Sequence, residues 1–106
     1  MNLKKEVKRN GHPRFYELLN IIADLHSKKN ADYCGYRDPL ANLRLCKMAG
    51  IDPFLGCIVR LSDKFSRLCS FAEKGYLEVK DEKIIDTLMD MSVYALLAII
   101  LLEEKK

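Results

Sequence analysis

Three carboxylates recur at four-residue intervals near the end of the chain: Glu82, Asp86 and Asp90. Residues four apart share one side of an α-helix, so this spacing predicts a line of three acids along a single helix. Like charges at this spacing repel each other, and the same side continues into the apolar residues Val93 and Leu97. We therefore expect a cation to lie against these acids.

The cation has two candidate sources. Mg²⁺ takes oxygen ligands and keeps several waters, so two or three carboxylates together with substrate phosphates would suffice to hold it. Under this interpretation Glu82, Asp86 and Asp90 are catalytic residues and metal ligands, and Asp32 assists them. Alternatively, the acids pair with Arg60, Lys64 or Arg67 of a neighbouring helix and fix its register.

Other side chains could recognise a nucleotide. Lysine and arginine bind phosphate oxygens, asparagine binds the edge of a base or sugar, and tyrosine stacks on a base. The alternatives are solvation for the cations, turn formation for Asn30, a helix surface for Asn42 and core packing for Tyr94. The predicted ligand-binding residues are Lys29, Asn30, Asp32, Tyr33, Asn42, Lys64, Arg67 and Tyr94. We expect His12 and His26 to be structural.

The elements that position these residues are predicted to be helical. Aspartate followed by proline marks a helix start, and glycine marks a helix end. A first helix is expected from Pro13 to about Ser27, followed by a loop over residues 28–39. The remaining predicted helices run from Asp38-Pro39 to Ala49, from Pro53 to Lys74 and from Asp81 to Leu102.

Two apolar patterns predict where the core lies. The helix from Pro53 carries an apolar seam at steps of four and three: Phe54, Ile58, Leu61, Phe65, Leu68 and Ala72. The apolar run 93–102 is about half the length of a membrane crossing, so we expect it to be buried on all sides, in a bundle or between subunits. The fold class predicted is all-α, a bundle of three main helices and one short helix in a single domain over residues 12–104. Residues 1–11 form a flexible lead-in, and the small size favours a homo-oligomer.

Composition excludes several classes of protein. The formal net charge is only +3, with basic and acidic residues interspersed, which argues against nucleic-acid binding. The four cysteines include no Cys-x-x-Cys pair, so free thiols in a reducing cytoplasm are expected rather than structural zinc. No apolar segment follows the first residues, so neither a signal peptide nor a membrane partner is expected.

Five short motifs in order resemble one known family. They are Lys29-Asn30-x-Asp32-Tyr33-x-Gly35, Asp38-Pro39-x-x-Asn42, Gly50-Ile51-x-Pro53, Asp63-Lys64-x-x-Arg67-Leu68, and Glu82-x-x-x-Asp86-Thr87-Leu88-x-Asp90-x-x-x-Tyr94-Ala95-x-Leu97. This pattern resembles the phage and bacterial nucleotide modification associated domain, type one, which is similar to the all-α NTP pyrophosphatases of the MazG and dimeric dUTPase type. The resemblance implies an oligomeric helical bundle, a nucleotide ligand, and Mg²⁺ held between acidic helices.

The resemblance leaves the activity open. The pyrophosphatase relatives carry a Glu-x-x-Glu helix, and this chain has no such motif. One hypothesis is a Mg²⁺-dependent NTP pyrophosphohydrolase of phage-type nucleotide metabolism. A second is an inactive protein that sequesters a nucleotide or cyclic nucleotide, as a phage would to counter host defence, and a third is a structural oligomerisation module.

Overall fold

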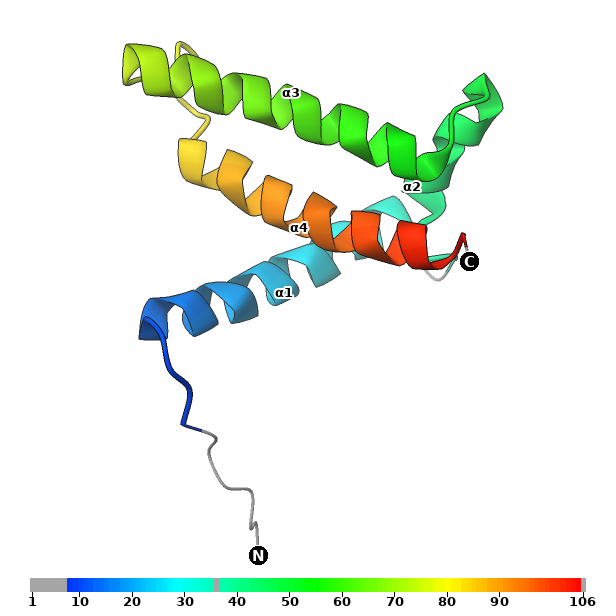
Figure 1. Ribbon diagram of the computed structural model, residues 1–106, viewed down its shortest axis with the longest axis horizontal. Coiled ribbons are helices and arrows are strands. Elements are labelled where there is room, and N and C mark those ends of the chain that lie inside the picture. Colours follow the sequence, from blue (N-terminus) through cyan, green and yellow to red (C-terminus); the bar gives the residue numbers. More distant parts are fainter. Residues whose placement is uncertain (1–7, 36, 106) are drawn as a thin grey trace, which may run out of the picture.

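The protein is all-helical over the residues described by its computed structural model, 8–35 and 37–105, and no strand occurs among them. The elements in chain order are α1 (Pro13–Tyr33), α2 (Ala41–Arg44), the 3-10 helix η1 (Leu45–Ala49), α3 (Pro53–Lys74) and α4 (Ile84–Glu103) (Figure 1). The prediction of an all-α fold class is therefore confirmed. The prediction for residues 1–7 of the lead-in lies outside the described residues.

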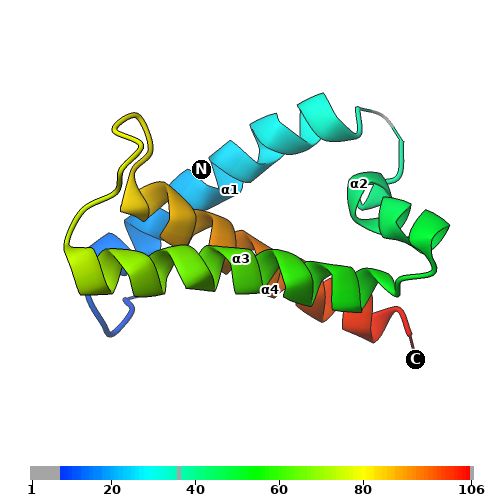
Figure 2. The same ribbon diagram turned by 90° about the horizontal axis from the view of Figure 1, so that it is seen from above.

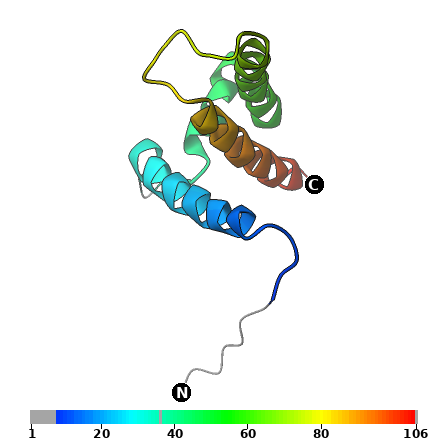
Figure 3. The same cartoon turned by 90° about the vertical axis from the view of Figure 1, so that its left-hand side faces the viewer.

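Helix α4 lies between the other two long helices. It runs antiparallel to α3, with which it forms a hairpin, and α1 lies on its other side (Figures 1 and 3). Seen from above, the C-terminal end of α1 diverges from the hairpin, and α2 lies at this end beside the start of α3 (Figure 2). The hairpin and α1 are therefore joined at two places, the middle of α4 and the segment around α2.

Local sequence signals set both ends of α3 as predicted. The Asp52 carboxylate accepts a hydrogen bond from the Leu55 amide at 3.1 Å, and Pro53 occupies the first helical position. Gly75 ends the helix with φ +84°, a left-handed conformation that costs glycine little. Gly50 ends η1 in the same way, with φ +73°.

Helix α1 extends to Tyr33, so the prediction of a loop over residues 28–39 is wrong for its first half. Residues 28–33 contain neither glycine nor proline, and the helical hydrogen bonds continue until the Cys34 amide donates to the Asn30 carbonyl at 2.8 Å. The first residue in this region with a left-handed conformation is Gly35, at φ +62°. Lys29, Asn30 and Tyr33 are therefore displayed on a helix.

Helix α4 begins at Ile84, so the prediction of a helix capped by Asp81 is wrong. The Glu82 amide donates to the Val79 carbonyl at 3.2 Å in a turn that precedes the helix. Glu82 therefore lies outside α4. The predicted line of three acids on one helix is reduced to Asp86 and Asp90.

The core is small and lies at one end of the molecule. Its buried residues come from the α2 region, from α3 and from the C-terminal half of α4, and they are Leu40, Leu43, Cys57, Ala98 and Leu101. Phe54, Tyr94 and Leu97 pack against them. Helix α1 contributes no buried residue, so it is attached to the rest of the chain by partly exposed contacts.

Within a single chain, the predicted burial of the apolar helices is met only in part. In the α3 seam, Ile58 and Phe65 are 40% and 59% exposed. Helix α4 buries only Thr87, Ala98 and Leu101, so its own chain does not enclose it on all sides, and the alternative of burial between subunits stays a prediction. By length and composition α4 is also long and apolar enough to cross a membrane, because the helix extends well beyond the ten-residue run. Only 17% of its apolar stretch is buried within the chain.

Candidate functional site

A cavity of about 190 Å³ is enclosed by α1, α3, α4 and the segment around α2. Seven residues that the sequence singles out as candidates line it: Lys29, Asn30, Tyr33, Asn42, Lys64, Asp90 and Tyr94. Apolar side chains, among them Ile22, Leu25, Val93 and Leu97, complete the wall. A mostly apolar wall with a few convergent polar groups is the usual composition of a small-molecule site.

The charged part of the cavity is one carboxylate held by two ammonium groups. Asp90 on α4 accepts a hydrogen bond at Oδ1 from Lys29 Nζ on α1, at 3.2 Å, and its Oδ2 forms an ion pair with Lys64 Nζ on α3, at 3.1 Å. Asp90 thus links three helices, and it is the principal polar tie between α1 and the hairpin among the described residues. The cluster keeps one net positive charge, which suits an anionic ligand.

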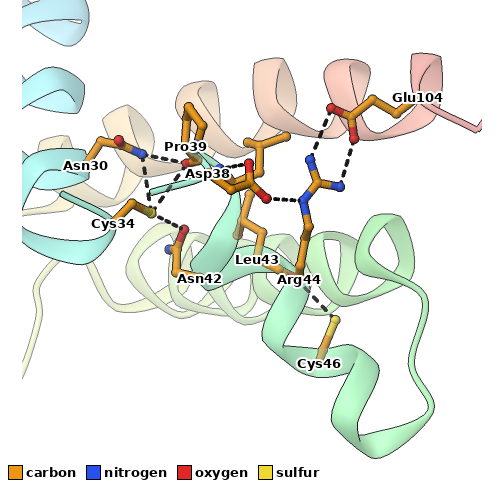
Figure 4. Close-up of polar contacts among 10 residues, drawn as sticks. Asn30, Cys34, Asp38, Pro39, Asn42, Leu43, Arg44, Cys46 and Glu104 are labelled. Atoms are coloured by element: carbon orange, nitrogen blue, oxygen red, sulfur yellow. Dashed lines mark hydrogen bonds and ion pairs between the residues drawn. The ribbon is translucent and has the colours of Figure 1, made fainter. Parts of the chain in front are cut away.

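The two asparagines are tied to the segment that closes the cavity. Asn30 Nδ2 donates to the Pro39 carbonyl at 2.7 Å, and the buried Cys34 thiol donates to Asn42 Oδ1 at 3.4 Å (Figure 4). Asn30 therefore joins the end of α1 to the following turn, a contact similar to the turn-forming role that was the alternative for this residue. Both amides are nevertheless held in fixed positions at the cavity wall.

The two tyrosines differ in accessibility. Tyr33 is 58% exposed although it lines the cavity, so much of its surface is accessible to a ligand. Tyr94 is half-buried against the core, with the Arg60 guanidinium 5.9 Å from its ring centroid. Tyr33 is therefore the better candidate for base stacking.

Four predicted site residues lie elsewhere. Glu82 pairs with Arg67 beside the connector between α3 and α4, and the Arg67 hydrogen bond lowers the pKa of Glu82 below its ordinary value. Asp32 and Asp86 are exposed and do not line the cavity. In the part of the chain that the structure describes, no three side chains of His, Cys, Asp or Glu form a group that could hold a metal ion.

His26 is a cavity residue that sequence reasoning assigned to structure only. It precedes Lys29 by three positions and Asn30 by four, so all three lie on one face of α1. The helical spacing of these three residues could have identified His26 as a site residue. The shared face was not recognised because the helix was predicted to end at Ser27.

An arginine fork anchors the α2 side of the cavity to α4. Arg44 donates to both carboxylate oxygens of Glu104, at 2.8 and 3.1 Å, and its Nε donates to Asp38 (Figure 4). The Asp38 carboxylate also accepts from the Leu40 amide at 3.0 Å. These bonds lower the pKa of Asp38 and raise that of Arg44. The fork holds in place the segment that carries Asn42 into the cavity wall.

Comparisons of the chain with family models, with curated proteins and with solved structures find no match.

Proposed function

We propose that this chain binds a nucleotide, or a small phosphate compound derived from one, in the cavity between α1, α3 and α4. One observation carries the proposal. Six of the eight ligand-binding residues predicted from the sequence, together with Asp90, line a single cavity although they come from four separate stretches of the chain. The order of motifs, which resembles a nucleotide-handling family, supports the same ligand class.

The chemistry of the wall suggests how such a ligand is held. Lys29 and Lys64 converge on one point from two helices, so a phosphate group bound there gains two charge-assisted hydrogen bonds. Tyr33 offers an exposed ring for the base. The cavity volume of about 190 Å³ is below that of pockets enclosing a whole drug-sized ligand, roughly 300–1,000 Å³. One part of the ligand would therefore enter, and the rest would lie across the mouth.

Binding without turnover is the activity that the geometry favours. The Asp90 carboxylate is already neutralised by two lysines, and Glu82 is paired with Arg67 away from the cavity. Sequestration of a nucleotide, in a cytoplasmic and oligomeric all-α bundle similar to the NTP pyrophosphatase fold, is accordingly the function we propose.

A Mg²⁺-dependent pyrophosphohydrolase is the second candidate, because Asp86 is exposed one helical turn before Asp90. Mg²⁺ bound to that pair would polarise a phosphate and supply an activated water. For this to happen, Asp90 would have to exchange its lysine contacts for the metal.

Isothermal titration with nucleoside mono-, di- and triphosphates and cyclic nucleotides, in EDTA and in Mg²⁺, tests the proposal. Lys29→Met and Lys64→Met are each expected to weaken binding about tenfold or more, since a hydrogen bond to a charged group contributes about 1.5–3 kcal/mol. Lys28→Met is the matched control: it alters the neighbouring, exposed lysine of α1, which does not line the cavity.

Two results would count against the proposal. Absence of binding by every compound would refute a nucleotide function, and binding unaffected by both lysine variants would place the ligand elsewhere. A parallel assay for released pyrophosphate separates the two candidates, because turnover in Mg²⁺ would favour the enzyme.

A further inference from the structure

The outer face of α4 carries an uninterrupted apolar stripe. Its residues are spaced alternately by three and four positions: Ile85, Leu88, Ser92, Ala95, Ile99 and Leu102. The four large members are 59%, 49%, 53% and 47% exposed, in chain order. The Ser92 hydroxyl donates to the Met89 carbonyl at 2.6 Å, so it does not interrupt the apolar surface. Alternation of three and four is the spacing of the seam between paired helices.

The stripe lies on the side of α4 away from the rest of the chain. Asp90, Tyr94 and Leu101, which contact the other helices or the core, occupy the opposite side of the helical turn. Helix α3 also exposes large apolar side chains, among them Leu55, Ile58 and Phe65. Both helices of the hairpin therefore turn an apolar side to the outside.

The exposed area is larger than that of a compact monomer. The chain exposes 8725 Å², whereas a compact monomer of the described size exposes about 5,700 Å². If every residue outside the described set is taken as fully exposed, at roughly 165 Å² each, an excess of roughly 1,500 Å² remains. Obligate dimers bury about 1,000–2,500 Å² per partner, so the excess is large enough for one interface of that kind.

We infer that the partner is a second copy of this chain, docked antiparallel through α4. The stripe is self-complementary about its midpoint between Val93 and Tyr94. An antiparallel two-fold places Ile85 opposite the partner's Leu102, Leu88 opposite the partner's Ile99 and Ser92 opposite the partner's Ala95. The small residues allow the helices to approach closely at the centre, and large residues fill both ends. A two-fold interface requires this kind of self-complementarity.

A membrane is the competing occupant, since α4 has the length and composition of a span. The opposite side of the helix, however, holds Asp90 in ion pairs with Lys29 and Lys64. Insertion would carry three charged groups and two packed helices into hydrocarbon, which costs several kcal/mol for each charge. A second copy covers the stripe and leaves the cavity open on the other side of α4.

Sedimentation velocity on the full chain tests the inference. The wild type should sediment as a dimer at micromolar concentration, and Leu88→Glu should weaken the dimer at least a hundredfold with an unchanged helical circular dichroism spectrum, because Leu88 is half exposed in one chain. Leu45→Glu, at a residue of η1 that is 62% exposed, is the matched control and should remain dimeric.

Charge pairing tests the direction of the helices. An equimolar mixture of Leu88→Glu and Ile99→Lys should recover the dimer, since these positions face each other in the antiparallel register. A mixture of Leu88→Glu and Leu88→Lys should not recover it; recovery there would indicate a parallel pair and overturn the register. If Leu88→Glu loses its helical spectrum, dissociation is judged from Ile99→Lys alone.

Three further outcomes would overturn the inference itself. They are a monomeric wild type throughout the concentration range, a Leu88→Glu variant that stays fully dimeric, and a monomeric wild type that co-sediments with lipid vesicles. The last outcome would assign the stripe to a membrane surface. None of these outcomes depends on whether the cavity binds a nucleotide.

Discussion

Replacing Asp90 with asparagine should lower the stability of the protein and raise its affinity for a phosphate ligand. The carboxylate now neutralises Lys29 and Lys64, at 3.2 and 3.1 Å. Asparagine has a similar shape but no charge, so the two ammonium groups lose their counterion and remain available to a ligand. The two effects have opposite signs, which makes the variant informative.

The size of the stability loss depends on how exposed the three charged side chains are. Their side chains are between 28% and 45% exposed, so each ion pair contributes about 0.5–1 kcal/mol after screening by solvent. Loss of both pairs should cost about 1–2 kcal/mol, and each kcal/mol lowers the melting temperature by about 4–8 °C in a domain of this size. Attachment of α1 should weaken most, because it contributes no buried residue.

The gain in affinity follows from the removal of a competing anion. A phosphate placed against both lysines would lie about 5–6 Å from the carboxylate. At an effective dielectric constant of about 40–80, a dianion at that distance is repelled by about 1.5–3 kcal/mol. Asp90→Asn should therefore bind a nucleoside monophosphate roughly 10- to 150-fold more tightly.

Thermal melts and isothermal titration in EDTA measure both quantities, with Asp63→Asn on the exposed surface of α3 as the control. Unchanged affinity in Asp90→Asn would show that phosphate does not compete with this carboxylate, and the proposed site would be wrong. Binding that requires Mg²⁺ and is lost in the variant would instead identify Asp90 as a metal ligand. That result would favour the pyrophosphohydrolase over the sequestering protein.

Three further predictions concern the framework of the site. Gly56→Ala should destabilise the fold by about 1 kcal/mol in urea unfolding, because the new Cβ would lie 2.8 Å from Cys46 Sγ. Overpacking costs about 1–3 kcal/mol, which exceeds the gain in helix propensity of about 1 kcal/mol. Replacing Cys46 with alanine in the same variant should restore the lost stability. The pKa of Asp38 is lower in the folded state, chiefly through the Arg44 hydrogen bond, so its contribution to stability is present above about pH 4 and is lost as the pH falls through the folded value. The difference in melting temperature between the wild type and Asp38→Asn should accordingly shrink between pH 7 and pH 3, and a constant difference would contradict the assignment. Gly75→Ala should cost about 1 kcal/mol or more because φ there is +84°, whereas an unchanged unfolding midpoint would show that the end of α3 tolerates a side chain.

The two sides of α4 differ in what they contact. The side with Asp90 contacts α1 and α3, and the stripe with Leu88 and Ile99 is exposed. Dimer formation through the stripe would stabilise the hairpin by mass action, so the melting temperature should rise with protein concentration. The same dependence should be absent in Leu88→Glu.

The sequence alone determined the features that depend on a few neighbouring residues. Asp52-Pro53 and Gly75 specify the ends of α3 because a cap, a fixed φ and a left-handed glycine act within one helical turn. The types of side chain in the cavity, among them Lys29 and Lys64, were also identified from the sequence. Local rules were weaker where such signals were missing, and both the end of α1 and the start of α4 were misplaced for that reason.

Only the tertiary structure decided which charges meet and which apolar surfaces are covered. Glu82 pairs with Arg67 and Asp90 with two lysines, because the turn before α4 and the crossing of α1 bring together groups that are far apart in the chain. Helical periodicity identifies an apolar face but does not say whether its partner lies in the same molecule. The face with Leu101 is buried in the core and the face with Leu88 is exposed, since a chain this short has only enough helices to cover one side of α4.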